Sequence, residues 1–434
     1  MVIMEYTSIQ EAMDKGSGKV ALRGWVHRER GSNKLKFVIL RDSTNKIQCV
    51  IDKEAVGEEN FSAADKLQIE ASLQVFGTIK KEDRAPTGYE VHVTHFDVIG
   101  ECDKFPIRSD QNREFLDDNR HLTLRTQRMA SILKIRSTYF QVREEFFQKK
   151  GFFRFDPPIL QPSQCEGGST LFEVKYYNDK TYLSQSWQLY AEAAVYALEN
   201  IYDAAPTFRA EKSKTSRHLS EFWMVEVECA WKDLHAISEL AKEELKYCIK
   251  GVLERHEEDL KSLGQDVAKL KKMVSAEWPT IKYRDVLRIL KEKKGLDVPF
   301  GKDLRTIEEE KVMEEFDTPV VVTHYPVEVM AFYKPRDPEH PDEALCFDML
   351  APEGYGEIVG GSQRSMDIED MKKRLEAEGE DCANYEWYFD LRRYGGVPHS
   401  GYGVGAERVI AWICKLDSIK DAIPFPRTML RWKP

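Results

Sequence analysis

A polar loop between two expected strands, near the middle of the chain, most constrains what this sequence can fold into. The first strand ends at Phe208–Glu211, and the second covers Trp223–Trp231, where apolar residues stand among acidic ones. The loop between them includes Lys212–His218, which is too polar and too cationic for a core. Arg209 at the strand end offers a rigid fork of donors to a phosphate or a carboxylate. The pattern therefore predicts an antiparallel strand pair with an anion site at its open end, where Phe222 would stack on a base.

Composition limits the class of protein. A chain of 434 residues predicts two or three domains, and 32% charged with 11% aromatic residues indicates a folded, soluble chain. No apolar run is long enough to span a membrane, and the first ten residues lack the pattern of a signal peptide. The eight cysteines are scattered without a CxxC pair, which argues against a disulfide scaffold or a zinc site. We therefore expect a cytoplasmic protein.

Charge is unevenly distributed along the chain. The net charge is −10, but the stretch from Lys19 to Lys53 has nine basic and only three acidic residues. A basic patch on an acidic chain is compatible with a local contact to a nucleic-acid backbone. Charge alone favours an ordinary solvated face.

Five strand-like runs fill residues 20–99, with turn-forming residues between them. A short helix is expected at Asp65–Ala71, between the third and fourth runs. Five short strands and one helix predict a small closed barrel of the OB type, which binds single-stranded nucleic acid by stacking and a basic groove. The expected strands are Val20–Val26, Leu35–Arg41, Ile47–Ile51, Leu73–Ile79 and Tyr89–Ile99.

The rest of the chain divides into a polar hinge at 105–126 and a larger domain at 127–434, after a barrel domain at 1–104. The larger domain opens with a helix at Gln127–Lys150, whose apolar residues recur at helical spacing. Residues 232–344 are charged and mostly helical in pattern, with no recognisable catalytic motif.

Two glycine-rich segments near the end of the chain carry further candidates. Leu345–Met366 has a hairpin pattern centred on Glu357, whose carboxylate oxygens suit Mg²⁺. Asp348 is a weaker candidate ligand, and a structural carboxylate fits it as well. Pro398–Arg408 has alternating glycines before an apolar helix, but no βαβ unit supports a dinucleotide loop.

Three segments together resemble the motifs of class II aminoacyl-tRNA synthetases. GFFRFDPPIL is similar to motif 1, FRAE with RHLSEF to motif 2, and GYGVGAER to motif 3. Each motif alone is weak, but the ordered set behind a barrel is specific and covers nearly the whole chain. The resemblance implies an α+β protein, in which a five-stranded OB barrel precedes an antiparallel catalytic sheet flanked by helices.

The resemblance also implies an ATP site with Mg²⁺ bound at Glu357. Phe222 and Arg408 would lie on opposite faces of the adenine, while Arg209, Glu357 and Arg408 would act in catalysis. Gly360 departs from the aspartyl branch, which has a serine ligand at that position, and a solvated loop residue is an alternative for His218. The implied ATP-binding residues are Arg209, Glu211, Arg217, His218, Leu219, Phe222, Glu357, Ile358, Gly405 and Arg408.

Within the family, the sequence is most similar to the aspartyl and asparaginyl branches. The aspartyl branch has a lysine after its QLY motif to neutralise a carboxylate, whereas this chain has Ala191, which favours asparagine. Arg364 would donate to the side-chain oxygen of the amino acid and Glu226 would accept from its amide. The implied amino-acid-binding residues are Glu166, Gln185, Gln188, Glu226, Arg364 and, through the missing lysine, Ala191.

The implied partner is tRNA(Asn), bound by a homodimer. RGWVHRER, KFVILRD and IQCVI resemble the anticodon-binding domain of class IIb enzymes. Arg28, Phe37 and Gln48 would then bind anticodon bases, since unpaired loop bases are what proteins read in RNA. A barrel core residue is the alternative for Phe37. Pro158 would lie at the dimer interface, and the end of a core strand is the alternative for it.

Three other functions are compatible with parts of the sequence. An aspartyl-tRNA synthetase, including one that does not discriminate between aspartate and asparagine, is disfavoured by Ala191. A paralogue that makes asparagine from aspartate is expected to lack the barrel. A non-catalytic RNA-binding or regulatory relative is disfavoured by the intact Arg209, Glu211, Phe222, Glu357 and Arg408.

Overall fold

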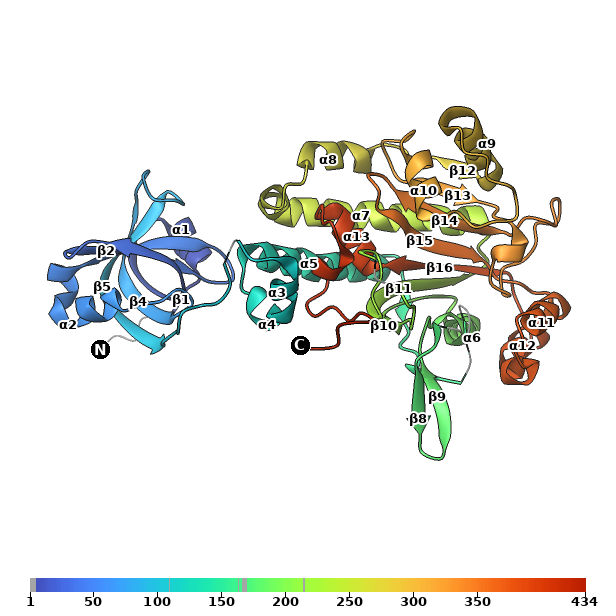
Figure 1. Cartoon of the computed structure of the whole chain (residues 1–434), viewed down its shortest axis with the longest axis horizontal. Helices are drawn as coiled ribbons and strands as arrows, with labels where there is room; N and C mark the ends of the chain where they lie inside the picture. Colours follow the sequence, from blue (N-terminus) through green and yellow to red (C-terminus); the bar gives the residue numbers. More distant parts are fainter. Residues whose placement is uncertain (1–4, 109, 163, 166–169, 214) are drawn as a thin grey trace. The chain divides into compact units, whose positions relative to one another are not determined.

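The computed structural model describes residues 5–434 except 109, 163, 166–169 and 214. The chain separates into two compact units, Met1–Gln111 and Asn112–Pro434 (Figure 1). Each unit has an apolar core of its own. The predicted fold class, an OB barrel followed by a synthetase-type sheet with helices, is confirmed.

The first unit is a closed barrel with strand order β1–β2–β3–β5–β4, and the five expected strands are confirmed. Side chains alternate along each strand, so that Val38 and Leu40 of the second strand are buried while Phe37 and Ile39 lie on the outer face. The strands are β1 (Gly18–Gly31), β2 (Leu35–Arg41), β3 (Lys46–Asp52), β4 (Ser72–Lys81) and β5 (Tyr89–Gly100).

The helix expected at Asp65–Ala71 is wrong. The barrel has α1 (Ile9–Lys15) and α2 (Lys53–Asp65), and α2 begins after Asp52, whose side chain accepts a hydrogen bond from a backbone N–H of its first turn. The helix ends where the prediction began, and Glu70 adopts a left-handed φ of 73° in the turn that follows.

The second unit is built on an eight-stranded sheet with order β12–β13–β14–β15–β16–β11–β10–β6 (Figure 1). Its centre is antiparallel, and its two edge pairs are parallel. The strands are β6 (Phe153–Arg154), β10 (Asn200–Phe208), β11 (Glu221–Ala230), β12 (Thr280–Lys282), β13 (Val320–Thr323), β14 (Cys346–Ala351), β15 (Gly356–Gln363) and β16 (His399–Gly405). A small three-stranded sheet consists of β7 (Leu160–Gln161), β8 (Glu173–Tyr176) and β9 (Asp179–Leu183).

The two predicted strand pairs are confirmed. β10 pairs with β11 so that Phe208 lies opposite Glu221, and the loop between these strands is the cationic loop. β14 and β15 form the second hairpin. β16 lies between β15 and β11 and therefore brings segments far apart in sequence to the middle of one sheet.

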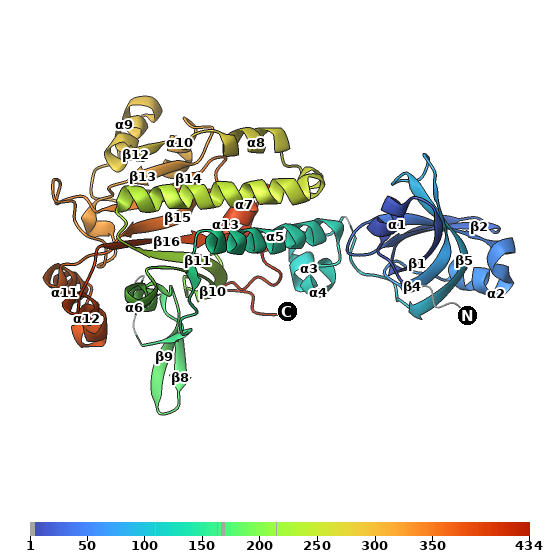
Figure 2. The ribbon, with the colours of Figure 1, turned by 180° about the vertical axis from the view of Figure 1, so that it is seen from behind.

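Helices cover the sheet on both faces. On one face α5 and α7 pack against each other and, through α7, against β15 and β16 (Figure 2). The helices are α3 (Arg113–Asp118), α4 (Arg120–Thr123), α5 (Gln127–Lys149), α6 (Gln188–Leu198), α7 (Leu234–Ser262), α8 (Val267–Ser275), α9 (Tyr283–Lys294), α10 (Thr306–Met313), α11 (Ile368–Ala377), α12 (Glu386–Arg393) and α13 (Ala406–Ile413), with 3₁₀ turns at Val327–Val329, Cys382–Tyr385 and Ile419–Asp421.

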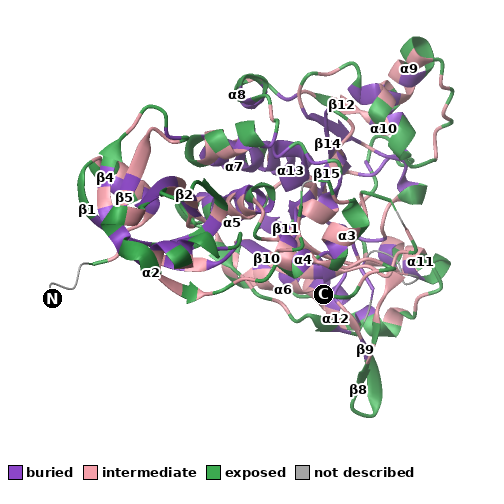
Figure 3. Ribbon diagram, turned by 60° about the vertical axis from the view of Figure 1, so that its left-hand side comes forward, coloured by how far each residue is buried: buried purple, intermediate pink, exposed green. Residues whose placement is uncertain are grey.

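A buried ion pair joins the two long helices α5 and α7, both of which have buried turns (Figure 3). Arg143 of α5 contacts the carboxylate of Glu244 on α7. The hydroxyl of Tyr402 on β16 donates to the same carboxylate. Tyr139 lies beside the arginine, with 4.4 Å between the guanidinium carbon and the ring centre. The sheet is thus bonded to both helices through one carboxylate.

The segment 232–344 is not only helical. Its helices α7 to α10 confirm the helical expectation, but β12 and β13 extend the central sheet at one edge. The apolar run in β13 is buried in a core of its own with α9 and α10. Among the residues that the structure describes, no helix is long and apolar enough to cross a membrane.

Candidate active site

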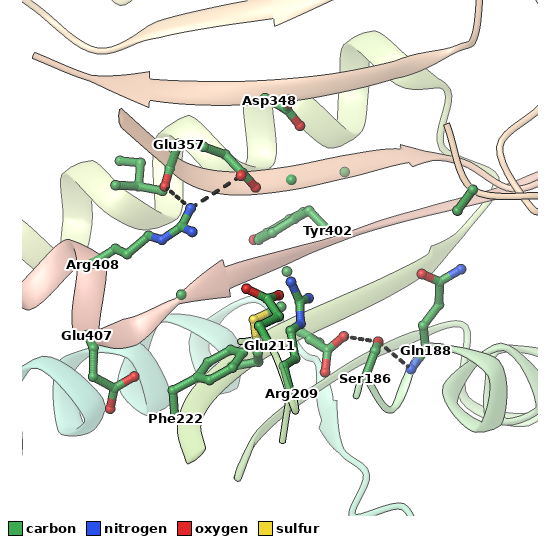
Figure 4. Close-up of a pocket in the computed structure, with 18 of the residues that line it drawn as sticks. Ser186, Gln188, Arg209, Glu211, Phe222, Asp348, Glu357, Tyr402, Glu407 and Arg408 are labelled. Carbon is green, nitrogen blue, oxygen red and sulfur yellow. Dashed lines mark hydrogen bonds and ion pairs between the residues drawn. The ribbon is translucent and has the colours of Figure 1, made fainter. Parts of the chain in front are cut away.

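A cavity of about 320 Å³ opens on the sheet face opposite α5 and α7 (Figure 4). Alternation along the strands turns Met224 and Gly403 toward it, while Val225 and Val404 pack in the core behind. Most of the predicted site residues line this cavity. They are Gln188, Arg209, Glu211, Arg217, His218, Leu219, Phe222, Glu226, Glu357, Ile358, Arg364, Gly405 and Arg408.

Arg209 stands at the open end of the β10–β11 pair. Its backbone N–H donates to the carbonyl of Ser220 at 3.0 Å, which continues the strand pairing into the loop. Its guanidinium carbon lies 5.5 Å from the centre of the Phe222 ring. Its Nε is buried and has no hydrogen-bond partner among the described residues. A buried donor without a partner on a cationic group is suited to an anionic ligand.

Arg408, in the first turn of α13, is fixed against β15. Its guanidinium donates to the backbone carbonyl of Glu357 at 2.7 Å and to the carboxylate of the same residue at 3.2 Å (Figure 4). Arg408 and Phe222 thus line the same cavity from different elements. This arrangement suits a planar base between a cation and a ring.

The cationic loop binds protein acceptors in the free chain. Arg217 donates to the carboxylate of Glu310 at 2.6 Å and to the carbonyl of Gly354. His218 lies with its Nε2 3.2 Å from the Glu211 carboxylate. Burial lowers the pKa of His218. A phosphate entering the cavity would have to replace these protein partners.

Carboxylates gather at the β14–β15 side of the cavity. Burial and the neighbouring Glu357 carboxylate raise the pKa of Asp348 well above its usual range. The same two causes raise the pKa of Glu309 to about 7. Burial also raises the pKa of Asp303. The carboxylates outnumber the cations near them, which are Lys334 beside Asp348 and Asp303, and Arg408 and Arg217 beside Glu309.

Gly360 leaves open the space between two of these carboxylates. A Cβ at this position would lie 3.1 Å from Glu357 Oε1 and 3.5 Å from Asp348 Oδ1. Hard carboxylate oxygens around such a gap fit Mg²⁺, which binds through few protein groups together with substrate phosphates. Among the described residues, no group of three His, Cys, Asp or Glu side chains could hold a metal ion by itself. Binding of Mg²⁺ at this place would therefore also need the phosphate oxygens of a substrate.

Replacing Glu309 with glutamine tests the accumulated negative charge through stability. Because the pKa of Glu309 is raised from 4.5 to about 7, the folded state retains a proton that the unfolded state loses, and stability falls as pH rises between these values. Glu309→Gln should therefore exceed the parent in unfolding free energy by up to about 3 kcal/mol at pH 8 and by little at pH 4.5. Denaturant titrations at both pH values measure the difference. The exposed Glu292→Gln should show no such pH dependence, and equal behaviour of the two variants would contradict the shift.

Gln188, Glu226 and Arg364, three of the residues predicted to bind the amino acid, line the same cavity. The Glu226 carboxylate accepts from the backbone N–H of Trp187 at 3.1 Å and from the Ser186 hydroxyl. The Arg364 guanidinium is ion-paired with the carboxylate of Glu228 and donates to the Ser362 hydroxyl at 2.8 Å. These bonds fix both groups before any ligand binds.

Other predicted residues lie elsewhere. Gln185 is buried beside the cavity wall, donating to the Thr170 hydroxyl at 2.7 Å and accepting from the Cys165 N–H at 3.3 Å. Ala191 is fully buried in an apolar cluster with Trp187 and is not among the described residues that line the cavity. Glu166 lies outside the described residues. Pro158 is exposed, in the segment after the edge strand β6.

Sequence reasoning missed the contribution of residues 303–334. Asp303, Met330, Tyr333 and Lys334 line the cavity although they belong to the segment in which no motif was recognised. Met330, Tyr333 and Lys334 follow β13, which pairs with β14 and so directs the chain after it over the cavity, whereas Asp303 precedes this strand. No local pattern distinguishes them. Only a prediction of the sheet order would have found them.

The barrel carries a second candidate site. Cross-strand register places Arg28 opposite Ile39 and Ile39 opposite Gln48, so Arg28, Phe37 and Gln48 share the outer face of the barrel. The Gln48 amide donates to Glu90 at 3.0 Å, whereas its oxygen is buried without a partner among the described residues. The three predicted residues thus come together, and Phe37 is not a core residue.

Two family models match the chain. The model for class II tRNA synthetases (D, K and N) matches residues 112–429, and the model for the OB-fold nucleic-acid-binding domain matches residues 20–99. The chain belongs to the class II tRNA synthetases of the D, K and N group. Within that family it is 44% identical to the asparagine–tRNA ligase of Thermoplasma acidophilum, over 98% of this chain and 100% of the relative.

Solved structures of the family agree with the fold. The crystal structure of asparaginyl-tRNA synthetase from Pyrococcus horikoshii, complexed with asparaginyl-adenylate, matches with a TM-score of 0.96 and 44% identity, covering 100% of both chains. The asparaginyl-tRNA synthetase of Entamoeba histolytica, also with asparaginyl-adenylate, matches with a TM-score of 0.89 and 27% identity over 99% of each chain. The chain therefore shares its whole length with the asparaginyl members of this synthetase family.

Proposed function

We propose that this protein is an asparagine–tRNA ligase, which activates L-asparagine with ATP and transfers it to tRNA(Asn). The observation that carries the proposal is the cavity itself. It is lined by Arg209, whose buried Nε has no hydrogen-bond partner among the described residues, and by polar side chains that are already hydrogen-bonded to the protein. The similarity of the whole chain to an enzyme crystallised with asparaginyl-adenylate supports the same reaction. The tRNA partner favours a cytoplasmic location.

The first step joins the amino acid to AMP. A carboxylate oxygen of asparagine attacks the α-phosphorus of ATP, and the bond from that phosphorus to the bridging oxygen of pyrophosphate breaks. Arg209 stabilises the charge that develops on the α-phosphate, and Phe222 with Arg408 holds the adenine. Glu357, with Asp348, would hold Mg²⁺ together with the phosphates, and the ion would supply further positive charge there. A terminal ribose hydroxyl of tRNA then takes the aminoacyl group, and AMP leaves.

The direct test is amino-acid-dependent exchange of pyrophosphate into ATP, compared for asparagine and aspartate. We expect exchange with asparagine and little with aspartate, because Ala191 supplies no lysine to neutralise a carboxylate. Strong exchange with aspartate would replace the proposal with an aspartyl or non-discriminating enzyme. Exchange with neither amino acid, with no ATP binding, would indicate a non-catalytic relative.

We further propose that the outer face of the barrel binds the anticodon of tRNA(Asn) through Arg28, Phe37 and Gln48. Stacking on Phe37 is sequence-tolerant, whereas the buried oxygen of Gln48, which has no hydrogen-bond partner among the described residues, would accept from a base edge. The arginines around Phe37 contribute charge against the backbone, and the Arg30 guanidinium carbon lies 5.5 Å from the Phe37 ring centre.

Removing the Phe37 ring should weaken tRNA binding alone. Phe37→Ala is expected to raise the KM for tRNA(Asn) about tenfold or more, since base stacking on one ring is worth about 1–3 kcal/mol. Exchange of pyrophosphate without tRNA should not change. The matched control is Phe76→Ala on β4, whose ring stacks on His95 on the outer surface of the barrel. If Phe37→Ala and Phe76→Ala raise the KM for tRNA(Asn) equally, the cause is a loss of barrel stability and not the loss of stacking.

A homodimer through the segment around β6 completes the proposal. Phe153, Ile159 and Leu160 have 54%, 43% and 42% of their surface exposed, and Pro158 lies among them. Large apolar side chains exposed beside an edge strand favour coverage by another copy of the chain. Sedimentation at equilibrium tests the dimer, and a monomer at micromolar concentration would contradict it.

A further inference from the structure

A completely buried carboxylate behind the amino-acid pocket is not used by the reaction as described above. Glu192 of α6 has no exposed surface. It accepts from the Gln188 amide at 3.0 Å, from the Tyr388 hydroxyl at 2.8 Å, from Arg392 at 2.5 Å and from His399 Nε2 at 2.9 Å. Its partners come from α6, α12 and β16, so it joins three elements around one side of the cavity.

Glu192 fixes which way the Gln188 amide faces. The amide nitrogen of Gln188 points to Glu192, so the amide oxygen is turned toward the other cavity residues (Figure 4). A carbonyl oxygen accepts hydrogen bonds and is suited to the α-ammonium group of an amino acid. The hydrogen bond to Glu192 therefore holds the Gln188 amide in the orientation that presents its oxygen, an acceptor, to the cavity.

The geometry also defines the charges of the cluster. His399 Nδ1 lies 2.7 Å from the carbonyl oxygen of Val397, which can only accept, and Nε2 faces the Glu192 carboxylate. Both ring nitrogens therefore face acceptor oxygens, an arrangement that suits the doubly protonated imidazolium form of His399. Burial alone would raise the pKa of Glu192, but Arg392 and His399 hold it below its usual range.

The charged groups immediately around Glu192 balance one another when His399 is counted as an imidazolium. The cations are Arg364, Arg392 and His399, and the Arg364 guanidinium lies 3.9 Å from Glu192. The carboxylates are Glu192, Glu228 and Glu226. Three positive and three negative charges cancel, and a neutral carboxamide fits such a pocket better than a carboxylate does, since a carboxylate would add an uncompensated charge.

We propose that Glu192 is a positioning and specificity-determining residue of the amino-acid site, which orients Gln188 and keeps the pocket neutral. The inference rests on the proposed function, because it concerns the choice of asparagine over aspartate. Glu192 does not line the cavity among the described residues, so it acts through Gln188, Arg364 and Arg392.

Two substitutions separate its two roles. Glu192→Gln removes the negative charge, so the Gln188 amide loses its ionised acceptor and the pocket gains a net positive charge. The KM for asparagine should rise, and the preference for asparagine over aspartate in kcat/KM should fall about tenfold or more. Glu192→Asp keeps the charge but shortens the reach to Gln188, so the KM for asparagine should rise with the preference retained.

The measurement is amino-acid-dependent pyrophosphate exchange with the full-length protein. Glu343→Gln is the matched control, a buried carboxylate paired with Arg284 outside the cavity, and it should change neither KM nor preference. An unchanged preference in folded Glu192→Gln would overturn the proposal. If that variant does not fold, an unchanged KM in Glu192→Asp would overturn it. A parent protein without asparagine-dependent exchange would instead overturn the proposed function.

Discussion

Arg209→Gln should lower asparagine-dependent pyrophosphate exchange by about a thousandfold, because a preorganised donor to a developing oxyanion is worth about that much in a water-poor site. The guanidinium has a buried Nε without a partner among the described residues and is oriented by the loop pairing with Ser220. Glutamine retains a donor but not the charge or the fork. The fall should appear mainly in kcat, since the charge on the α-phosphate grows in the transition state.

The stability of Arg209→Gln should be close to that of the parent, because a buried donor without a partner contributes nothing favourable to folding. Arg305→Gln serves as the control, since this exposed arginine lies outside the cavity and is paired with Glu308 on α10. Exchange kinetics and thermal unfolding on the same preparations separate the two effects. Full activity of Arg209→Gln would remove this residue from the mechanism.

Glu244→Gln should lower the unfolding free energy by about 3–5 kcal/mol, because it leaves the fully buried Arg143 without a counter-charge. The Tyr402 hydroxyl also loses its charged acceptor. Denaturant titration measures the loss. The exposed Glu254→Gln, on the same helix, should have almost no effect.

The double variant Arg143→Met with Glu244→Leu distinguishes an ion-pair effect from poor packing. Replacing both charges with apolar groups of similar volume removes the desolvation cost together with the attraction. We expect it to recover most of the stability that the single variant loses. A double variant as unstable as Glu244→Gln would show that the pair is needed for its shape.

The sequence predicted those features that depend on neighbouring residues. The β10–β11 pair with Arg209 and Phe222, and the β14–β15 hairpin with Glu357, each lie within one local segment. Their convergence on one cavity followed from the resemblance to a family with known motif order. Side chains alternate between the two faces of β2. If Val38 and Leu40 belong to the barrel core, this alternation predicts that Phe37 lies on the outer face.

Other features depend on contacts across the chain. Glu192 is hydrogen-bonded to Arg392 and His399, which lie 200 and 207 residues later in the chain. No local sequence pattern predicts these two pairs. Lys334 reaches the cavity only because β13 takes its place in the sheet. The helix of the barrel has a local signal that the prediction did not use, because Asp52 caps the start of α2, which ends at Asp65.

The bond between Arg217 and Glu310 has a consequence for the departure of product. An arginine that had only the pyrophosphate as partner would be left desolvated and unpaired when that product leaves, which would slow its release. Glu310 and the Gly354 carbonyl give the guanidinium a second place to bind. We therefore expect the loop to exchange one partner for the other as pyrophosphate dissociates, so that turnover does not require an unpaired cation at any stage.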